Sequence, residues 1–178
     1  RCPVTTRYDP QILGKGGAIK NVVDFWDLRP FMVINADIVA DIDLADVYRT
    51  HCRQHPPATL VLCDDPAFNS VAVEQDKWIK AFQNSDRNSC QPAQRLLTFT
   101  GIQVIEPQVL DYIPEKASSS SIDAFRKILA DDKKLQAYIA PKGRWQDIGT
   151  PERYRQTAFE TALPRAFRKA FGDIPGLR

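Results

Sequence analysis

The stretch that most constrains the fold is residues 31–43, which read Phe-Met-Val-Ile-Asn-Ala-Asp-Ile-Val-Ala-Asp-Ile-Asp. The first five residues are apolar except Asn35, a pattern typical of a buried β-strand. Asp37 follows, and a carboxylate is out of place at a buried apolar position. Because ligands of α/β proteins bind where strands end, Asp37 is a candidate metal ligand. The stretch therefore predicts an α/β fold with a site at the end of this strand.

A second carboxylate of interest lies far downstream, in residues 143–154 (Gly-Arg-Trp-Gln-Asp-Ile-Gly-Thr-Pro-Glu-Arg-Tyr). Thr150 followed by Pro predicts a helix N-cap and the first helical position. We expect Asp37 and Asp147 to converge on one divalent cation. The alternatives are that Asp37 is a turn former or helix cap, and that Asp147 caps the helix that begins at Thr150.

Composition indicates an ordinary globular protein. The 178 residues are 43% hydrophobic and 26% charged, and we read residues 1–178 as a single domain. A formal net charge of +2 gives no reason to expect a nucleic acid or a membrane as partner. No apolar run reaches the ~20 residues of a membrane helix. The four cysteines are scattered without C-x-x-C spacing, so we expect reduced thiols and a cytoplasmic protein.

Residues 13–20 (Leu-Gly-Lys-Gly-Gly-Ala-Ile-Lys) hold three glycines within four positions. This predicts a loop whose backbone comes close to a ligand, and helical spacing of apolar residues begins at Ala18. A loop leading into a helix N-terminus suits an anion or a nucleobase edge. The alternative is an ordinary glycine turn. The P-loop spacing is absent.

The periodicity of the remaining chain predicts strands at 3–8, 31–36, 58–63, 70–75, 78–82, 97–105 and 135–140, and helices at 44–55, 107–112, 121–130 and from 150 to about 171. Residues 83–95 are polar and predict a surface loop. The strands at 70–75 and 78–82 predict a hairpin, whereas the rest suggests a mostly parallel sheet. Gly101 inside a strand indicates a bulge or the close approach of a ligand.

Further assignments concern polar residues. Asp43 is expected to cap the helix at 44–55, with Asp41 in the preceding loop. His51 and His55 lie one helical turn apart, and we favour a solvated helix end over a metal pair. Ser120 and Asp123 resemble a capping box. Glu152 and Arg153 are read as surface helix residues.

Four segments, in this order, resemble the sugar-1-phosphate nucleotidylyltransferases: residues 13–20, 33–37 (Val-Ile-Asn-Ala-Asp), 99–107 (Phe-Thr-Gly-Ile-Gln-Val-Ile-Glu-Pro) and 145–154. The last segment, Trp-x-Asp-Ile-Gly-Thr-Pro-Glu, is the most specific. The resemblance spans residues 3–157. It implies a Rossmann-like nucleotidyltransferase fold of GT-A-like type, with three layers.

The resemblance also implies roles for residues. These are nucleobase contact through the backbone for Gly16 and Gly17, Mg²⁺ binding for Asp37 and Asp147, sugar contact for Thr100 and Gly101, and packing beside the site for Trp145. The implied reaction transfers a nucleoside monophosphate from a nucleoside triphosphate to a sugar 1-phosphate, giving an NDP-sugar and pyrophosphate. The substrate phosphate is the nucleophile, so a metal ion and positioning would supply the rate. Oligomerisation is left open.

The sequence departs from the family pattern in several places. The signature loop Gly-x-Gly-Thr-Arg-Leu is absent, which predicts the C-terminal part of a larger domain without its first strand-loop-helix units, inactive by itself. Ala36 replaces the family's Gly before the first metal-binding aspartate. Lys15 replaces a Thr of the family's glycine loop, and we expect this change to affect which nucleobase is bound. Residues 82–86 replace the family's Glu-Lys-Pro. Two other readings stay open: a non-catalytic binding or regulatory domain, and a metal-dependent glycosyltransferase suggested by Asp41-Ile-Asp43.

Overall fold

The computed structural model describes residues 4–9, 11–25, 27–83, 94–115, 118–141 and 145–162. Most of the surface loop predicted at 83–95, and the helix predicted beyond residue 162, lie outside the described residues. Residues 4–9 form no strand, so the strand predicted at 3–8 is wrong over the part that is described.

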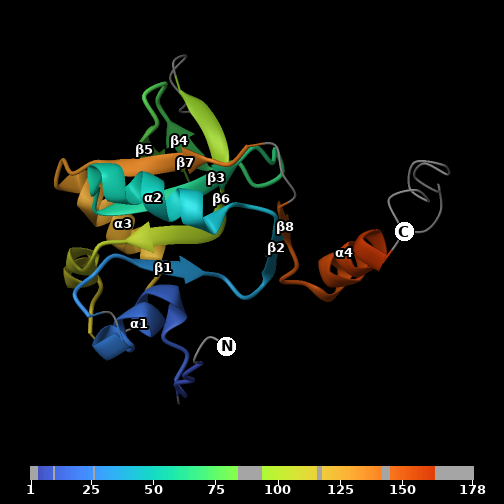
Figure 1. Ribbon diagram of the computed structural model, residues 1–178, viewed down its shortest axis with the longest axis horizontal. Helices are drawn as coiled ribbons and strands as arrows, with labels where there is room; N and C mark the ends of the chain where they lie inside the picture. The colour runs from blue at the N-terminus through green and yellow to red at the C-terminus, as the bar shows by residue number, and fades with distance from the viewer. Residues whose placement is uncertain are drawn as a thin grey trace.

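A six-stranded sheet forms the centre of the molecule (Figure 1). In spatial order its strands are β1 (Phe31–Ile34), β6 (Arg95–Ile105), β3 (Ala58–Cys63), β7 (Leu135–Ile139), β5 (Trp78–Phe82) and β4 (Val71–Val73). The α/β class is confirmed, but the parallel pairing expected for most of the sheet is limited to β3–β7, and the other pairings are antiparallel. The predicted hairpin β4–β5 is confirmed.

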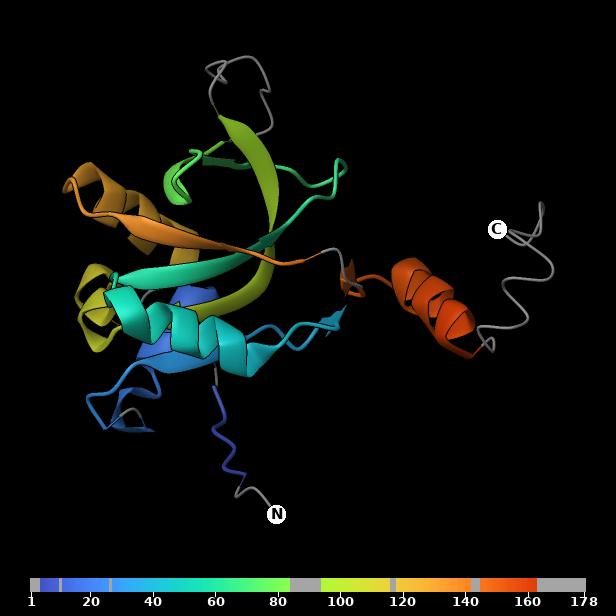
Figure 2. The ribbon, with the colours of Figure 1, turned by 45° about the horizontal axis from the view of Figure 1, so that its top comes forward.

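The long strand β6 explains why the sheet is mixed. One part of it pairs with both β1 and β3, whereas its first residues, 95–97, pair with β4. The strand therefore joins both ends of the sheet, and the sheet curls around it (Figure 2).

Helices cover both faces of the sheet and give three layers (Figures 1 and 2). Alternation along β3 shows this: Leu60 and Leu62 pack in one cluster with α1 (Gly14–Lys20), the 3₁₀ helix η3 (Pro107–Tyr112) and α3 (Ser121–Ala130). Val61 packs in the other cluster, with Val47 of α2 (Leu44–Gln54). The expected three-layer arrangement is therefore present.

Caps fix the starts of the two amphipathic helices. The side chain of Asp43 accepts a hydrogen bond from the amide of Asp46 at 3.0 Å, so the predicted cap of α2 is confirmed. Ser120 caps α3 by accepting from the amide of Ile122 at 3.1 Å. The helix at 121–130 is confirmed, although Ser120 binds the second helical amide instead of the third, which a capping box requires.

Two sequence predictions about helices need correction. The glycine segment is helical, because α1 begins at Gly14 and ends at Lys20, followed by the short 3₁₀ helix η1 (Val23–Phe25). His51 is fully buried instead of solvated, with Nδ1 at 2.9 Å from Oγ1 of Thr59. His55 does lie exposed at the end of α2.

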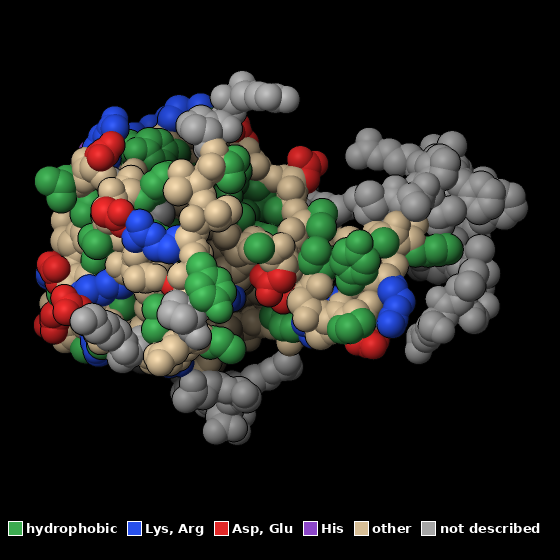
Figure 3. Space-filling view, turned by 90° about the horizontal axis from the view of Figure 1, so that it is seen from below, with side chains coloured by type: hydrophobic (Ala, Val, Ile, Leu, Met, Phe, Trp, Pro, Cys, Tyr) green, Lys and Arg blue, Asp and Glu red, His purple; other side chains and the backbone are tan. Residues whose placement is uncertain are grey.

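A separate two-stranded ribbon pairs β2 (Ile38–Ala40) with β8 (Trp145–Asp147). The strand β8 is not predicted from the sequence, in which the last expected strand is 135–140. The helix α4 (Pro151–Ala162) follows the ribbon and extends away from the sheet (Figure 1). Its apolar side chains Tyr154 and Phe159 are exposed, and apolar groups appear along this segment at the right of Figure 3. No helix among the described residues is long and apolar enough to cross a membrane.

Candidate active site

The β2–β8 ribbon brings the two predicted acidic residues together. Ile38 lies opposite Asp147 in the antiparallel register, so Asp37 and Asp147 are neighbours across the ribbon. The amide of Ile148 donates to the backbone oxygen of Asp37 at 2.9 Å. Two segments more than 100 residues apart in the sequence are thereby held in one fixed register.

The two carboxylates face the same small space. A Cβ atom added to Gly149 would lie 3.2 Å from Oδ2 of Asp37 and 3.4 Å from Oδ1 of Asp147. Both oxygens are therefore within reach of one point, and a side chain at position 149 would occupy that point. The absence of a side chain on Gly149 leaves room for a group that bridges the carboxylates.

Asp147 is held as a carboxylate by its neighbours. Its Oδ1 accepts hydrogen bonds from Nη1 of Arg153 at 2.8 Å and from the amide of Gly149 at 3.0 Å. Partial burial raises the pKa of Asp147, but these hydrogen bonds and the charges of Arg153 and Lys15 outweigh burial, so the pKa lies below its ordinary value. Arg153 thus supports the site, whereas sequence reasoning placed it on the helix surface.

Aromatic side chains anchor this arrangement to the sheet. The indole nitrogen of Trp145 donates to the backbone oxygen of Thr100 in β6 at 2.9 Å. Phe68 meets Trp145 edge-on, with ring centroids 6.2 Å apart, and the guanidinium of Arg153 lies 4.8 Å from the Phe68 ring centroid. Such cation–π and edge-to-face contacts restrict the side chains that they join. Trp145 and Phe68 therefore position both β8 and Arg153.

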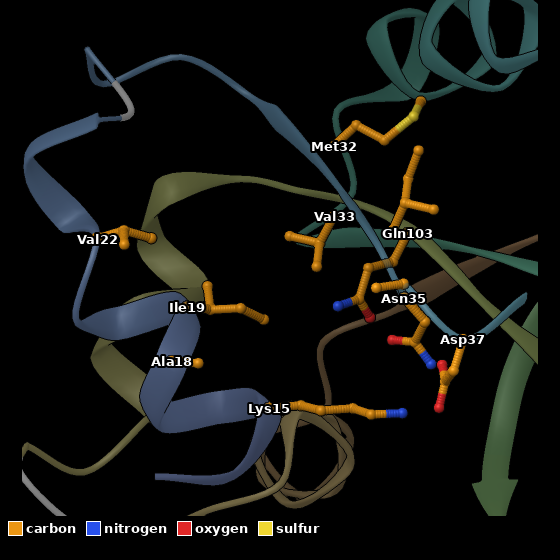
Figure 4. Close-up of a pocket in the computed structure, with 11 residues that line it drawn as sticks. Lys15, Ala18, Ile19, Val22, Met32, Val33, Asn35, Asp37 and Gln103 are labelled. Carbon is orange, nitrogen blue, oxygen red and sulfur yellow. The ribbon is translucent and has the colours of Figure 1, made fainter. Parts of the chain in front are cut away.

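A cavity of about 700 Å³ opens beside β1 and α1, and Asp37 lies on its wall (Figure 4). Apolar side chains such as Ile19 and Val33 form much of the wall, and Lys15, Asn35 and Gln103 add polar groups. The Oε1 atom of Gln103 is buried and has no hydrogen-bond partner among the residues that the structure describes. A buried acceptor without a partner is costly, so this atom lowers the stability of the cavity wall.

A second cavity, of about 350 Å³, lies on the other side of Asn35 and contains Asp147. Thr100 and Gly101, the predicted sugar-contacting residues, are among its lining residues. The hydroxyl of Thr100 donates to the backbone oxygen of Val61 at 2.8 Å, so it is used within the sheet. Gly101 has a φ of +84°, and a Cβ there would lie 2.5 Å from Nδ2 of Asn35. Only glycine therefore fits at position 101, because any side chain there would clash with Asn35.

The two predicted nucleobase contacts lie elsewhere. Gly16 is buried, and its amide donates to the backbone oxygen of Ser119 at 2.9 Å. Gly17 lines a separate hollow of about 410 Å³, together with Lys20 and Asn21. Among the residues that surround the 700 Å³ cavity, the glycine segment contributes Lys15, Ala18 and Ile19 instead. The nucleobase role of Gly16 and Gly17 stays a prediction.

The site contains few candidate metal ligands. Among the described residues, no group of three or more His, Cys, Asp and Glu side chains is arranged to hold a metal ion. Asp37 and Asp147 are therefore a pair of oxygen donors. Such a pair suits a hard divalent cation that keeps several of its waters.

Solved structures share this fold. UTP-bound UGPase from Acinetobacter baumannii superposes with a TM-score of 0.72 at 17% identity, over 90% of this chain and 61% of that chain. HddC from Yersinia pseudotuberculosis, complexed with GMP-PN, gives a TM-score of 0.67 at 19% identity, over 86% of this chain and 64% of that chain. The Rossmann-like nucleotidyltransferase fold expected from the sequence is confirmed.

Sequence comparisons identify the family. The Nucleotidyl transferase family model matches residues 2–162. Mannose-1-phosphate guanylyltransferase of Mycobacterium tuberculosis is 32% identical over 145 residues, 79% of this chain and 39% of the relative. UTP–glucose-1-phosphate uridylyltransferase of Synechocystis is 28% identical over 174 residues, 93% of this chain and 43% of the relative. The chain thus spans about two fifths of the length of these relatives. It belongs to the nucleotidyl transferase family, among the sugar-1-phosphate nucleotidylyltransferases.

Proposed function

We propose that the protein carrying this chain transfers a nucleoside monophosphate from a nucleoside triphosphate to a sugar 1-phosphate, releasing pyrophosphate and forming an NDP-sugar. The observation that carries the proposal is the shared space between the Asp37 and Asp147 carboxylates beside Gly149. Membership of the nucleotidyl transferase family supports the reaction class.

The chemistry explains why two carboxylates suffice. An oxygen of the sugar phosphate attacks the α-phosphorus of the triphosphate, and the bond from that phosphorus to the pyrophosphate oxygen breaks. Two anions must approach each other, and Mg²⁺ held by Asp37 and Asp147 would neutralise charge on their phosphates. The low pKa of Asp147 keeps this donor ionised at neutral pH. Arg153 and the ribbon position it.

The names of two relatives limit the substrates that we propose. These relatives are named for guanylyl transfer to mannose 1-phosphate and uridylyl transfer to glucose 1-phosphate. We therefore propose GTP or UTP as the nucleotide and a hexose 1-phosphate as the acceptor. The cavities on either side of Asn35 offer separate space for the two substrates. We further propose a cytoplasmic protein without a nucleic-acid or membrane partner, in keeping with its small net charge.

Removing either carboxylate tests the proposal. In the protein carrying this chain, Asp37→Asn and Asp147→Asn should each lower pyrophosphate release from GTP or UTP plus a hexose 1-phosphate by about a hundredfold or more, the usual scale for lost electrostatic stabilisation. Each should also weaken Mn²⁺ binding, followed by electron paramagnetic resonance.

Asp41→Asn is the matched control, since Asp41 is an exposed carboxylate in the same segment. It should leave both readouts unchanged. Near-normal turnover and Mn²⁺ affinity in both site variants would show that the carboxylate pair is not the metal site. Absence of turnover in the wild-type protein, with intact nucleotide binding, would favour a non-catalytic binding domain.

A further inference from the structure

The glycine segment is docked against the turn that precedes α3. The amide of Ser119 donates to the backbone oxygen of Leu13 at 2.9 Å, and the amide of Gly16 donates to the backbone oxygen of Ser119 at the same distance. A Cβ on Gly14 would lie 2.6 Å from the Ser119 oxygen, and one on Gly16 would lie 2.7 Å from Ser119 Oγ. Gly14 and Gly16 are therefore explained by packing against Ser119.

Lys15, between these glycines, is directed to the opposite side. It is exposed and lines both the 700 Å³ cavity and the 350 Å³ cavity. Figure 4 shows its side chain extending from the start of α1 toward Asn35 and Asp37. Because Leu13 and Gly16, on either side of the Gly14–Lys15 pair, are hydrogen-bonded to Ser119, the backbone at Lys15 is held in place while its ammonium group can reach either cavity.

The ammonium group of Lys15 is unpaired among the residues that the structure describes. Within the described part of the chain Lys15 forms no ion pair shorter than 4.0 Å. By contrast, Arg153 is paired with Asp147 at 2.8 Å, and Arg126, which also lines the 350 Å³ cavity, is paired with Asp123 at 3.3 Å. Lys15 still acts on the site from a distance, because its charge contributes to the lowered pKa of Asp147. A positive charge therefore lies on the wall of both cavities, the larger of which is lined by Asp37 and the smaller by Asp147.

We propose that the ammonium group of Lys15 binds a phosphate group of the substrates, opposite Asp37 and Asp147. This inference rests on the proposed function. A lysine suits the task because its compact charge and three rotatable donors match phosphate oxygens without a fixed geometry. The packing of Gly14 and Gly16 against Ser119 then fixes the position of Lys15, and the segment contacts the ligand through the Lys15 side chain.

The phosphate could belong to the nucleoside triphosphate or to the sugar 1-phosphate, since Lys15 borders both cavities. The experiment separates these sources. Dissociation constants for GTP, UTP, guanosine, uridine and mannose 1-phosphate are measured by calorimetry with Mg²⁺, on the protein carrying this chain. The variants are Lys15→Met, Lys15→Arg and, as a control of equal net charge, Lys80→Met, whose exposed lysine in β5 pairs with Glu74.

Lys15→Met should weaken binding of the phosphorylated ligand about 10- to 100-fold, the scale of a charge-assisted hydrogen bond. Binding of guanosine and uridine should not change. Lys15→Arg should lose less affinity for the phosphorylated ligand than Lys15→Met does. Lys80→Met should bind it with the affinity of the wild type. A loss for GTP or UTP assigns Lys15 to the triphosphate, and a loss for mannose 1-phosphate alone assigns it to the sugar phosphate.

Equal binding of every phosphorylated ligand by the wild type and Lys15→Met would overturn the inference and leave the proposed function standing. Equal losses for nucleosides and nucleotides would also overturn it, since the effect would then not depend on phosphate. If the wild type binds none of the phosphorylated ligands, both the inference and the proposed function fail. Thermal unfolding of each variant confirms that the fold is retained.

Discussion

At His51 the direction of neighbouring hydrogen bonds determines which ring nitrogen carries the proton. The hydroxyl of Thr59 donates to Oε1 of Gln136 at 3.1 Å, so its oxygen must accept from Nδ1 of His51. The other ring nitrogen, Nε2, then lies 3.3 Å from Oε1 of Glu106 without the geometry of a hydrogen bond. Glu106 also accepts from Nδ1 of the exposed His55 at 2.9 Å. The Glu106 carboxylate therefore lies close to both histidines and accepts a hydrogen bond from His55.

This arrangement predicts a pH dependence of stability. Burial lowers the pKa of His51 below its ordinary value of 6.5, and Glu106 only partly opposes this shift. The unfolded chain therefore takes up a proton at a higher pH than the folded protein does, so the free energy of unfolding should fall as pH falls through about 6.5. Urea unfolding at pH 8, 6.5 and 5.5 measures the slope, which should be shallower in His51→Gln.

His55→Gln provides the comparison, because His55 lies on the same helix with its side chain 63% exposed. It should keep the slope of the wild type. Identical slopes in all three proteins would rule out His51 as the group responsible.

Individual residues also mark the limit of sequence reasoning. Asp37 and Asp147 were paired from their positions after a strand and within a specific motif, and the structure brings them together. The partners of Arg153 and His51 were missed, because residue type and helical spacing do not reveal which distant segment a side chain meets. The close approach of the Asn35 side chain to Gly101 cannot be read from the sequence either, although the sequence does single out this glycine.

At the scale of elements, the caps make a testable contribution. Asp43→Ala removes the hydrogen bond to the Asp46 amide and should lower the free energy of unfolding by about 1 kcal/mol, as typical N-cap substitutions do. The exposed ion pair of Asp43 with Arg49, at 3.7 Å, adds little. Chemical unfolding checks this. Asp41→Ala, in the loop just before, should change stability by less than about 0.5 kcal/mol, and equal effects would contradict the capping role.

Elements with strong local signals were predicted well. The helix α2, the strand β3 and the β4–β5 hairpin each carry periodicity or caps in their own residues. The first residues of α1, 14–17, which were expected to form a loop, and the strand β8 were not predicted, for a common reason. Glycines disfavour a helix, so α1 depends on its docking to Ser119, and β8 depends on its pairing with β2. Tertiary contacts define both elements.

At the scale of the whole molecule, the apolar core lies on both faces of the sheet. Ile128 of α3 is fully buried in the larger cluster and lines none of the three cavities described above. Ile128→Ala should cost about 2–5 kcal/mol of stability, and Ile128→Val about 0.5–1.5 kcal/mol. Mn²⁺ affinity of the folded protein should not change in either variant, because the carboxylate pair is held by the ribbon. Calorimetric Mn²⁺ titration under native conditions checks this, and weaker binding in Ile128→Val would show coupling between the core and the site.

The layered α/β architecture followed from the strands and helices read along the chain, but the pairing of strands did not. Periodicity shows that 97–105 is a strand, and it does not show that β6 pairs with β1, β3 and β4. A mixed sheet results because one long strand joins segments from distant parts of the chain. The resemblance to a family supplied the fold that local patterns left open.

The β2–β8 ribbon has only three residues in each strand, yet its pairing sets the register between Asp37 and Asp147. Any ligand that bridges these carboxylates binds the closed ribbon and not the opened one, so binding and closure must strengthen each other by the same amount. A substitution that loosens the ribbon's backbone pairing, however far from the acidic groups, therefore reduces ligand affinity by the factor by which it lowers the closed fraction of the ribbon.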